Sequence, residues 1–229
     1  MEEHEVKIFT RLLLIRHGQT AQNIKHAYSG WNEMLLNETG HQQAHLIAQR
    51  LKRQYPVDVL YASPLKRAIQ TAEYIGKAFD LSINTNQDLL EYGFGDLSDQ
   101  EVSLLKDTNP ELYQEINAWQ EAPVSNRPSR PTIPAAESFE QFKHRIQSFT
   151  DLILKEHKGK HIAAVSHGGF IRSFVYYHVG GDFSKYVPFW ADNTSLTIID
   201  FYNGNPTISL FNDISHTSEQ ITLGYPRLL

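Results

Sequence analysis

The sequence predicts an α/β fold, a three-layer sandwich in which helices cover both faces of a mostly parallel central sheet. Short apolar runs, too short to be whole helices, alternate with helical patterns along most of the 229 residues. Two of these runs, within residues 12–18 and 163–169, end in a His that is followed at once by Gly. Alternation of strands and helices is typical of parallel sheets with helices packed on both faces.

The N-terminal half is expected to contain three strands and two helices. Asn37 is a preferred N-cap residue, so the first helix should begin near Glu38. Ser63 and Pro64 are expected to be the cap and the first helical residue of the second helix, which should end near Phe79. The expected strands are residues 11–16, 57–61 and 81–84.

The C-terminal half combines an insertion with a return to the strand and helix pattern. Residues 98–120 are expected to be helical with a break at Asn109 and Pro110, and four prolines within 121–136 predict a long ordered surface loop. Ser138 and Gln141 form a capping-box pattern, and Asn203-Gly204 predicts a hairpin turn. The remaining elements should be helices 139–157 and 169–178 and strands 160–165, 196–201 and 207–211.

Composition favours one domain. A hydrophobic content of 41% allows a substantial core, and strands of the same kind stand on both sides of the Pro-rich stretch. We therefore expect a single domain over residues 1–229, with a helical and Pro-rich insertion at about 97–137 that lies over the sheet edge near the active site.

Charge and cysteine content exclude several classes of protein. The net charge is 21 − 26 = −5, which argues against a nucleic-acid partner. The absence of Cys excludes disulfides, thiolate nucleophiles and Cys-bound zinc. The acidic N-terminus and the lack of a long apolar run predict no signal peptide and no membrane association. We expect a cytoplasmic protein, and the sequence leaves its oligomeric state open.

Positive and hydrogen-bonding side chains follow the predicted strands. Arg16 and His17 end the first strand, Arg67 lies one turn into the helix that follows the second, and His167 ends a later strand. Ligands of open α/β sheets bind beyond the carboxyl ends of the strands. Guanidinium groups, imidazoles and helix N-termini all bind phosphate, and glycines such as Gly168 allow the backbone to approach a ligand. The pattern predicts phosphate chemistry.

A neutral imidazole can attack phosphorus, and an acid is then needed to protonate the leaving oxygen. Glu91 is a candidate because it lies among apolar and aromatic residues, but Asp88 or Asp96 would serve equally well. His41 and His45 have the helical spacing of metal ligands but lack the accompanying Glu of a zinc-protease helix, so we expect a solvated helix face and no metal site.

Five segments in order resemble the histidine phosphatase superfamily, the phosphoglycerate mutase-like enzymes. The first is Arg-His-Gly-Gln-Thr-Ala-Gln-Asn at 16–23, which resembles the family signature. The others are Ser-Gly-Trp-Asn at 29–32, Ser-Pro-Leu-Lys-Arg at 63–67, Leu-Glu with Phe-Gly-Asp at 90–96, and Ser-His-Gly-Gly-Phe-Ile-Arg at 166–172. Asn-Thr-Ser at 193–195 matches a later family element. The resemblance implies a phosphoglycerate mutase-like fold and a small phosphorylated metabolite as substrate.

The resemblance also implies roles for individual residues. His17 would be the nucleophile that becomes phosphohistidine, and Glu91 would be the proton donor and later the base that activates water. Neither a metal nor a cofactor is required. The residues that would bind the substrate phosphate are Arg16, Asn23, Ser29, Gly30, Arg67, His167 and Gly168.

The sequence departs from the family pattern outside the phosphate pocket. Family phosphatases often have Gly-Asp-Trp-Glu-Gly where this chain has Gly-Asp-Leu-Ser-Asp at 95–99, and Gly-Gly-Glu-Ser where it has Ala-Ala-Glu-Ser at 135–138. The paired Arg that binds the substrate carboxylate in the resembling mutases is absent, which favours hydrolysis. Arg127 and Arg130, in the Pro-rich loop, are further candidates for contact with substrate.

The expected activity is that of a metal-independent phosphomonoesterase. The alternatives are a phosphoglycerate mutase and a catalytically silent phosphate-binding protein on the same fold. The natural substrate is not readable from the sequence: sugar phosphates, phosphorylated acids and ribazole phosphate all remain open.

Overall fold

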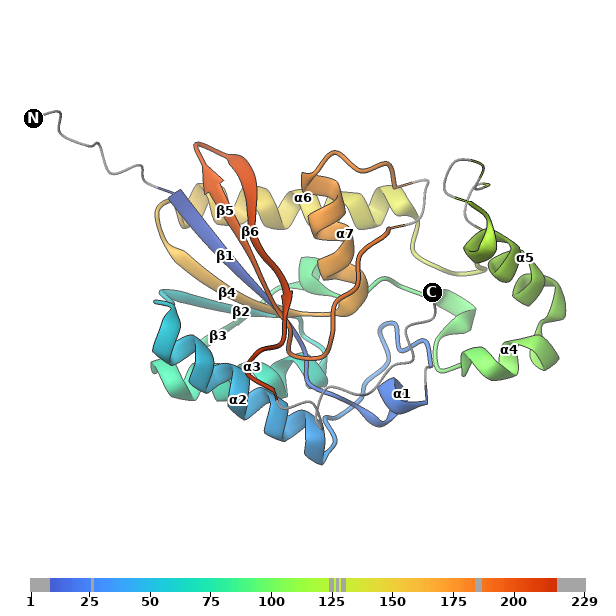
Figure 1. Cartoon of the computed structure of the whole chain (residues 1–229), viewed down its shortest axis with the longest axis horizontal. Coiled ribbons are helices and arrows are strands. Elements are labelled where there is room, and N and C mark those ends of the chain that lie inside the picture. The colour runs from blue at the N-terminus through green and yellow to red at the C-terminus, as the bar shows by residue number, and fades with distance from the viewer. Residues whose placement is uncertain are drawn as a thin grey trace, which may run out of the picture.

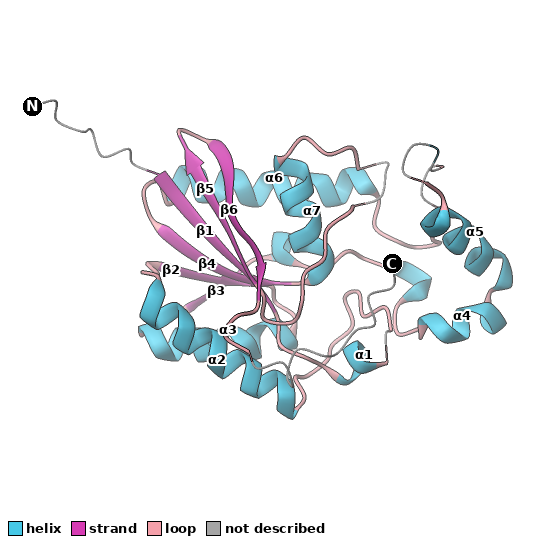
Figure 2. Cartoon of the chain, viewed as in Figure 1, coloured by secondary structure: helices cyan, strands magenta, loops and turns pink. Residues whose placement is uncertain are grey.

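The computed structural model describes residues 9–217 apart from residues 26, 124–125, 127, 129–130 and 184–186. One sheet of six strands lies at its centre, with helices on both sides (Figures 1 and 2). The predicted α/β class with a mostly parallel sheet is therefore confirmed. Among the described helices, none combines the length and apolar character needed to cross a bilayer.

The strands are arranged in the order β3-β2-β4-β1-β5-β6. Strand β1 pairs in parallel with β4, and β2 pairs in parallel with both β4 and β3. The last two strands run antiparallel to their neighbours and form one edge of the sheet. The bounds are Phe9–Arg16 for β1, Val59–Ala62 for β2, Ile83–Thr85 for β3, His161–Ser166 for β4, Leu196–Tyr202 for β5 and Asn205–Asp213 for β6.

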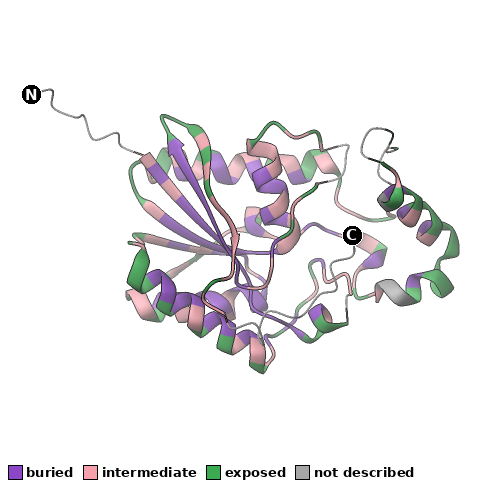
Figure 3. Cartoon of the chain, viewed as in Figure 1, coloured by how far each residue is buried: buried purple, intermediate pink, exposed green. Residues whose placement is uncertain are grey.

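Alternation along β1 divides the core into two layers. Side chains of successive strand residues point to opposite faces of a sheet. Leu13 and Ile15 pack with helices α2 (Glu38–Gln54) and α3 (Lys66–Phe79) on one face. Leu12 and Leu14 pack on the other face with α6 (Phe139–Glu156) and α7 (Gly168–His178). All of these strand residues are fully buried, as Figure 3 shows for the middle of the sheet.

Local sequence signals correctly predicted the starts of two helices and one hairpin turn. The Asn37 side chain accepts a hydrogen bond from the N–H of Gly40 at the start of α2. Ser138 and Gln141 form a complete capping box at the start of α6. Asn203 and Gly204, between β5 and β6, both have positive φ, as a type I′ hairpin turn requires.

The predicted cap at Ser63 is wrong. Helix α3 begins at Lys66, and Leu65, which has extended backbone angles, precedes it without a side-chain cap. The hydroxyl of Ser63 instead forms a 2.7 Å hydrogen bond with the imidazole of His167, 104 residues away. The Ser63 hydroxyl, which the local pattern predicted as a helix cap, is thus engaged in a tertiary contact.

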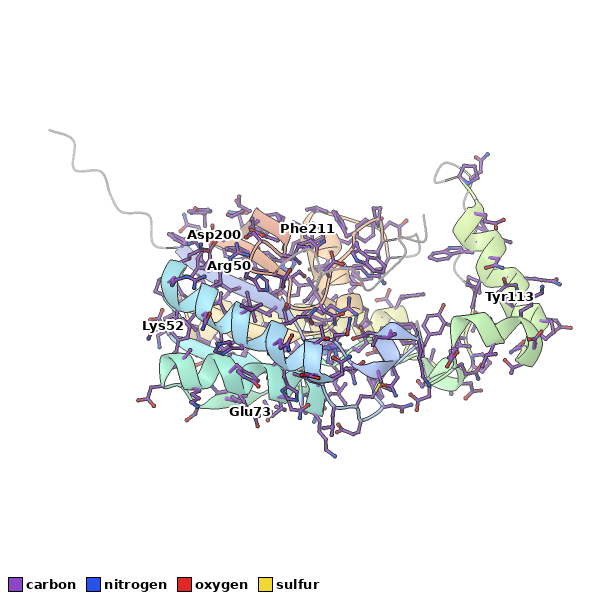
Figure 4. All side chains as sticks on the ribbon, turned by 60° about the horizontal axis from the view of Figure 1, so that its bottom comes forward. Arg50, Lys52, Glu73, Tyr113, Asp200 and Phe211 are labelled. Carbon is purple, nitrogen blue, oxygen red and sulfur yellow. The ribbon has the colours of Figure 1, made fainter. Side chains whose placement is uncertain are left out.

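The insertion forms an arm beside the sheet (Figure 1). It contains α4 (Val102–Thr108) and α5 (Pro110–Glu121), with the predicted break at Asn109, whose side chain caps α5. Tyr113 of this arm lies far from the labelled strand residue Asp200 in Figure 4. A small core of its own holds the arm together, made of Leu97, Leu105, Leu112 and Ile116. Three short elements escaped prediction: α1 (Ala21–Ile24) and the 3₁₀ turns Gln87–Leu89 and Gly95–Leu97.

Candidate active site

Three neighbouring strands end at the same place. Arg16 of β1 is in register with Ser166 of β4, and Ala62 of β2 is in register with Val165. The residues that follow these strands, His17, His167 and Ser63, therefore meet at the carboxyl edge of the sheet. The ring centroids of His17 and His167 are 5.1 Å apart. Sheet pairing thus brings together two imidazoles that are far apart in sequence.

His17 is buried and has a defined tautomer. Its Nδ1 lies 2.7 Å from the carbonyl oxygen of Gly18. A carbonyl only accepts hydrogen bonds, so Nδ1 carries the proton and Nε2 keeps its lone pair. Burial, reinforced by the charges of Arg67 and Arg16, holds the pKa of His17 well below 6.5. The ring is therefore neutral at physiological pH, the form that an attacking imidazole needs.

His167 presents a second ring nitrogen to the site. Its Nε2 contacts the Ser63 hydroxyl, while the N–H of Leu65 approaches the same oxygen at 3.5 Å. An Oγ that accepts from Leu65 can donate to Nε2, which leaves the proton of His167 on Nδ1. That Nδ1 is buried without a hydrogen-bond partner in the described part of the chain. Burial and the nearby Arg67 lower the pKa of His167 well below 6.5.

Arg67 is a fully buried cation. Its two terminal nitrogens donate to the carbonyl oxygens of Asn32 and Gly30, at 2.8 and 2.7 Å. Its Nε is buried and has no partner among the described residues. Burial lowers the pKa of Arg67 to about 10, so the group stays charged at neutral pH. A buried guanidinium with an unused donor, next to an imidazole in the same condition, fits an anionic ligand.

Arg16 and Asn23 are tied to the loop that precedes β5. Arg16 Nη1 donates to the carbonyl oxygen of Ala191 at 2.7 Å. Asn23 is buried, and its Oδ1 accepts from the side chain of Asn193 and from the N–H of Thr20. These contacts occupy the amide oxygen of Asn23, and its amide nitrogen is the group that could donate to a ligand.

Two glycines approach the arginines closely. Gly30 has a φ of 47°, in the region that glycine adopts readily, and its carbonyl orients Arg67. A Cβ at Gly168 would meet the Nε of Arg16 at 3.3 Å, so a side chain there would crowd the guanidinium. Ser29 lies in the same loop as Gly30, half-buried. Gly30 and Gly168 thus lie against the arginines, Ser29 adjoins Gly30 in the chain, and the contact of these three residues with phosphate stays a prediction.

Glu91 lies against the N-terminus of α7. Its Oε2 accepts the N–H of Gly169 at 3.0 Å, and its Oε1 accepts the N–H groups of Phe170 and Tyr92 at 3.1 and 2.8 Å. The first turn of α7, which begins directly after His167, therefore holds the carboxyl of Glu91. The other two candidate acids differ: Asp88 bonds the hydroxyl of Ser148 on α6, and Asp96 is exposed.

Metal ligands do not gather in this region. Within the described residues, no group of three or more His, Asp or Glu side chains is placed to hold a metal ion. His41 lies 3.3 Å from the hydroxyl of Tyr74, and His45 lies 2.9 Å from the amide of Gln49. Arg127 and Arg130, the further candidates for substrate contact, lie outside the described residues.

Comparison with known proteins identifies the family. The sequence model of the histidine phosphatase superfamily, branch 1, matches residues 12–214. The chain belongs to this superfamily. The family expected from the five segments, with its phosphoglycerate mutase-like fold, is thereby confirmed.

Two relatives and one solved structure match nearly the whole length of the chain. Phosphoglycerate mutase-like protein 4 of Arabidopsis thaliana is 32% identical over 216 residues, which are 92% of this chain and 88% of that protein. Phosphoserine phosphatase 1 of Hydrogenobacter thermophilus is 30% identical over 209 residues, which are 91% of this chain and 95% of that protein. A crystal structure of phosphoserine phosphatase from Entamoeba histolytica, in complex with 3-phosphoglyceric acid, has a TM-score of 0.76 and 29% identity, over 90% of this chain and 98% of that chain.

Arg145 and Glu137 hold the segment around Glu91 in place, and neither role was predicted from the sequence. Arg145 donates to both carboxylate oxygens of Glu137 at 2.7 Å, and also to the carbonyl oxygens of Asp88, Leu90 and Glu91. The carboxylate of Glu137 accepts in addition from the N–H of Gly93. The sequence does place Glu137 just before a predicted helix and Arg145 about two turns into it, but this spacing does not indicate which backbone carbonyls the Arg contacts.

Proposed function

We propose that this chain is a metal-independent phosphomonoesterase that hydrolyses small phosphate esters through a phosphohistidine at His17. The main support for the proposal is that two buried hydrogen-bond donors without protein partners lie in the same site as an imidazole nitrogen that keeps its lone pair. The Nε of Arg67 and the Nδ1 of His167 are buried without partners in the described structure, while Nε2 of His17 keeps its lone pair. A phosphoryl group would accept from both donors and receive the attack of the third group.

The first step forms a bond from Nε2 of His17 to phosphorus and breaks the ester P–O bond. The alcohol oxygen takes the bonding electron pair and a proton from Glu91. Oε1 of Glu91 already accepts two N–H groups, whereas Oε2 accepts one, so Oε2 has the capacity to carry that proton. Arg16, Arg67 and His167 would hold the phosphoryl oxygens during the transfer, as charge shifts on them.

The second step returns the enzyme to its starting state. The carboxylate of Glu91 takes a proton from water, the water oxygen bonds to phosphorus, and the P–N bond to His17 breaks. Inorganic phosphate leaves, and the protonated Glu91 is ready for the next cycle. The names of the relatives support hydrolysis, because two of the three compared proteins are phosphoserine phosphatases.

The substrate class that we propose is a small phosphorylated acid or alcohol. The Entamoeba protein was crystallised with 3-phosphoglyceric acid, which supports phosphorylated acids among the candidates. A panel of phosphoserine, 3-phosphoglycerate, sugar phosphates and ribazole phosphate, compared by kcat/KM, would rank them.

The decisive experiment replaces the nucleophile. His17→Ala should lose phosphatase activity by about 10³-fold or more, and the wild type should take up radioactive phosphate on His17 from a labelled ester. Activity should persist in excess EDTA. Full activity of the variant on every ester would end the proposal. Interconversion of phosphoglycerates, primed by a bisphosphate and faster than hydrolysis, would establish a mutase instead, and failure to take up label would indicate a silent phosphate-binding protein.

A further inference from the structure

The loop before β5 holds the backbone of the proposed nucleophile. The N–H of Thr194 donates to the carbonyl oxygen of Arg16 at 3.0 Å and approaches that of His17 at 3.4 Å. The side chain of Asn193 donates to the same carbonyl of His17 at 3.0 Å. The main chain on either side of the attacking imidazole is therefore fixed by a loop that lies more than 170 residues further along the chain.

Thr194 adopts a conformation that its side chain disfavours. Its φ is 55°, in the left-handed region that β-branched residues rarely occupy. Such a conformation persists only where surrounding contacts determine it, and strained residues of this kind cluster at functional sites. Because the N–H of Thr194 donates to the carbonyl of Arg16, contacts that hold Thr194 in this conformation also hold the backbone of the site.

His216 holds the side chain of Thr194. The Nε2 of His216 lies 3.1 Å from Thr194 Oγ1, and its Nδ1 lies 3.4 Å from Nη1 of Arg50. A guanidinium only donates, so Nδ1 is the acceptor, and the proton of the neutral ring resides on Nε2, directed at Thr194. Burial, helped by Arg50, lowers the pKa of His216 to about 4, so the ring is neutral at neutral pH, and the contact with Arg50 selects its tautomer.

Arg50 is fixed in turn by Asp213. The two form a 2.6 Å ion pair between α2 and the end of β6, and the side chain of Arg50 is 6% exposed. Figure 4 labels Arg50 where α2 meets the strands. The hydrogen bond from Arg50 lowers the pKa of Asp213 to about 2, so this carboxylate stays charged at neutral pH. A chain of contacts thus runs from α2 through His216 and Thr194 to the backbone of His17.

We propose that His216 is a positioning residue of the active site, which acts by donating its Nε2–H to Thr194 and thereby fixing the main chain of Arg16 and His17. The inference rests on the proposed function, because it takes His17 to be the nucleophile. Small displacements of a reacting group cost large factors in rate, so loss of this contact should be felt in catalysis more than in folding.

Four variants of the full chain test the contact. His216→Leu removes the donor and Thr194→Val removes the acceptor with little change of shape. His216→Gln keeps an N–H at the position of Nε2. Thr217→Val is the matched control, because it removes a hydrogen bond of the same turn, from Thr217 to the carbonyl of Ile214, that does not reach Thr194.

With p-nitrophenyl phosphate as the probe, His216→Leu and Thr194→Val should each lower kcat about tenfold with a smaller change in KM. The double variant should be no slower than the slower single variant, since both remove one contact. His216→Gln should recover kcat to within about threefold of the wild type, and Thr217→Val should stay within about twofold. If His216→Leu and Thr194→Val match the Thr217→Val control, the inference is wrong.

A second readout separates this inference from the proposed function. The ¹⁵N signals of the His17 imidazole should shift in His216→Leu and Thr194→Val and stay in place in Thr217→Val. A wild type that fails to hydrolyse any ester would refute the phosphatase proposal, and the imidazole signals would still decide the positioning role. Unchanged signals in both variants would overturn it.

Discussion

The substitution Gly169→Ala, which adds a single methyl group, should remove acid catalysis by Glu91 and leave the other groups of the site in place. Gly169 lies in the first turn of α7, and a Cβ built there would overlap Oε1 of Glu91 and lie 3.0 Å from its carboxyl carbon. The obstacle is the far end of a flexible side chain, so Gly169→Ala should displace the carboxyl rather than the helix. The proposed proton donor would then leave its place while His17 stays.

The stability of this variant should fall moderately. Alanine is favoured over glycine within a helix by about 1 kcal/mol. Displacement of Glu91 gives up its bonds with the N–H groups of Gly169, Phe170 and Tyr92, each worth about 1 kcal/mol net. The free energy of unfolding should therefore fall by about 2 kcal/mol, which a urea titration can measure. Ser173→Ala, on the same helix, is the control for an added helix-favouring residue.

The loss of activity should depend on the leaving group. Removal of a general acid costs about 10²–10⁴-fold, or about 3–5 kcal/mol of barrier, for an alkyl ester such as phosphoserine. For p-nitrophenyl phosphate, whose leaving group departs readily as an anion, the loss should be about tenfold or less. Gly169→Ala combined with Glu91→Gln should be no slower than Glu91→Gln alone. If Gly169→Ala hydrolyses phosphoserine within about threefold of the wild-type rate, Glu91 is not the acid in this position.

Three further predictions concern the remaining groups of the site. The pH profile of kcat/KM should be bell-shaped, because the acid must be protonated while the imidazole of His17 must be neutral. Burial and the nearby arginines hold the pKa of His17 well below 6.5, so protonation removes the nucleophile only as the pH falls through that lowered value. An acid limb of the profile at 6.5 would contradict this. Arg67→Lys should raise KM and lower kcat, because an ammonium cannot bind the carbonyl of Gly30 and a phosphoryl oxygen at the same time. Steady-state kinetics measure both constants, and circular dichroism checks that the variant is folded. Wild-type values of KM and kcat in a folded variant would contradict this role of Arg67. Arg145→Met should destabilise the protein by about 3–5 kcal/mol, because it leaves the buried carboxylate of Glu137 without its ion-pair partner. Thermal unfolding measures the loss, and the double variant Glu137→Gln/Arg145→Met, which also removes the negative charge, should recover part of the stability.

Local signals in the sequence predicted most elements because they act over a few residues. Asn37 caps α2, and Ser138 caps α6, through hydrogen bonds to N–H groups three residues away. The same locality explains the failures. Strand β2 begins at Val59 rather than at residue 57, and short elements such as α1 lack a full hydrophobic period.

The sequence by itself determined the family and the kinds of side chain, imidazole and guanidinium, that stand at the strand ends. His17 and His167 each follow an apolar strand, and adjacent parallel strands bring their ends to one edge of a sheet whatever the rest of the chain does. Phosphate chemistry could be inferred from these residues because the chemical character of Arg and His does not depend on the fold.

The tertiary structure alone decided how those groups are held. Ser63, predicted to cap a helix, forms a hydrogen bond with His167 instead. Glu91 differs from Asp88 because it lies at the start of α7, and His216 contacts Thr194. Each of these contacts joins residues that are separated in sequence and lie close only after the sheet and helices have packed. A hydrogen bond depends on atomic positions within a few tenths of an ångström, and no periodicity or local motif encodes such positions.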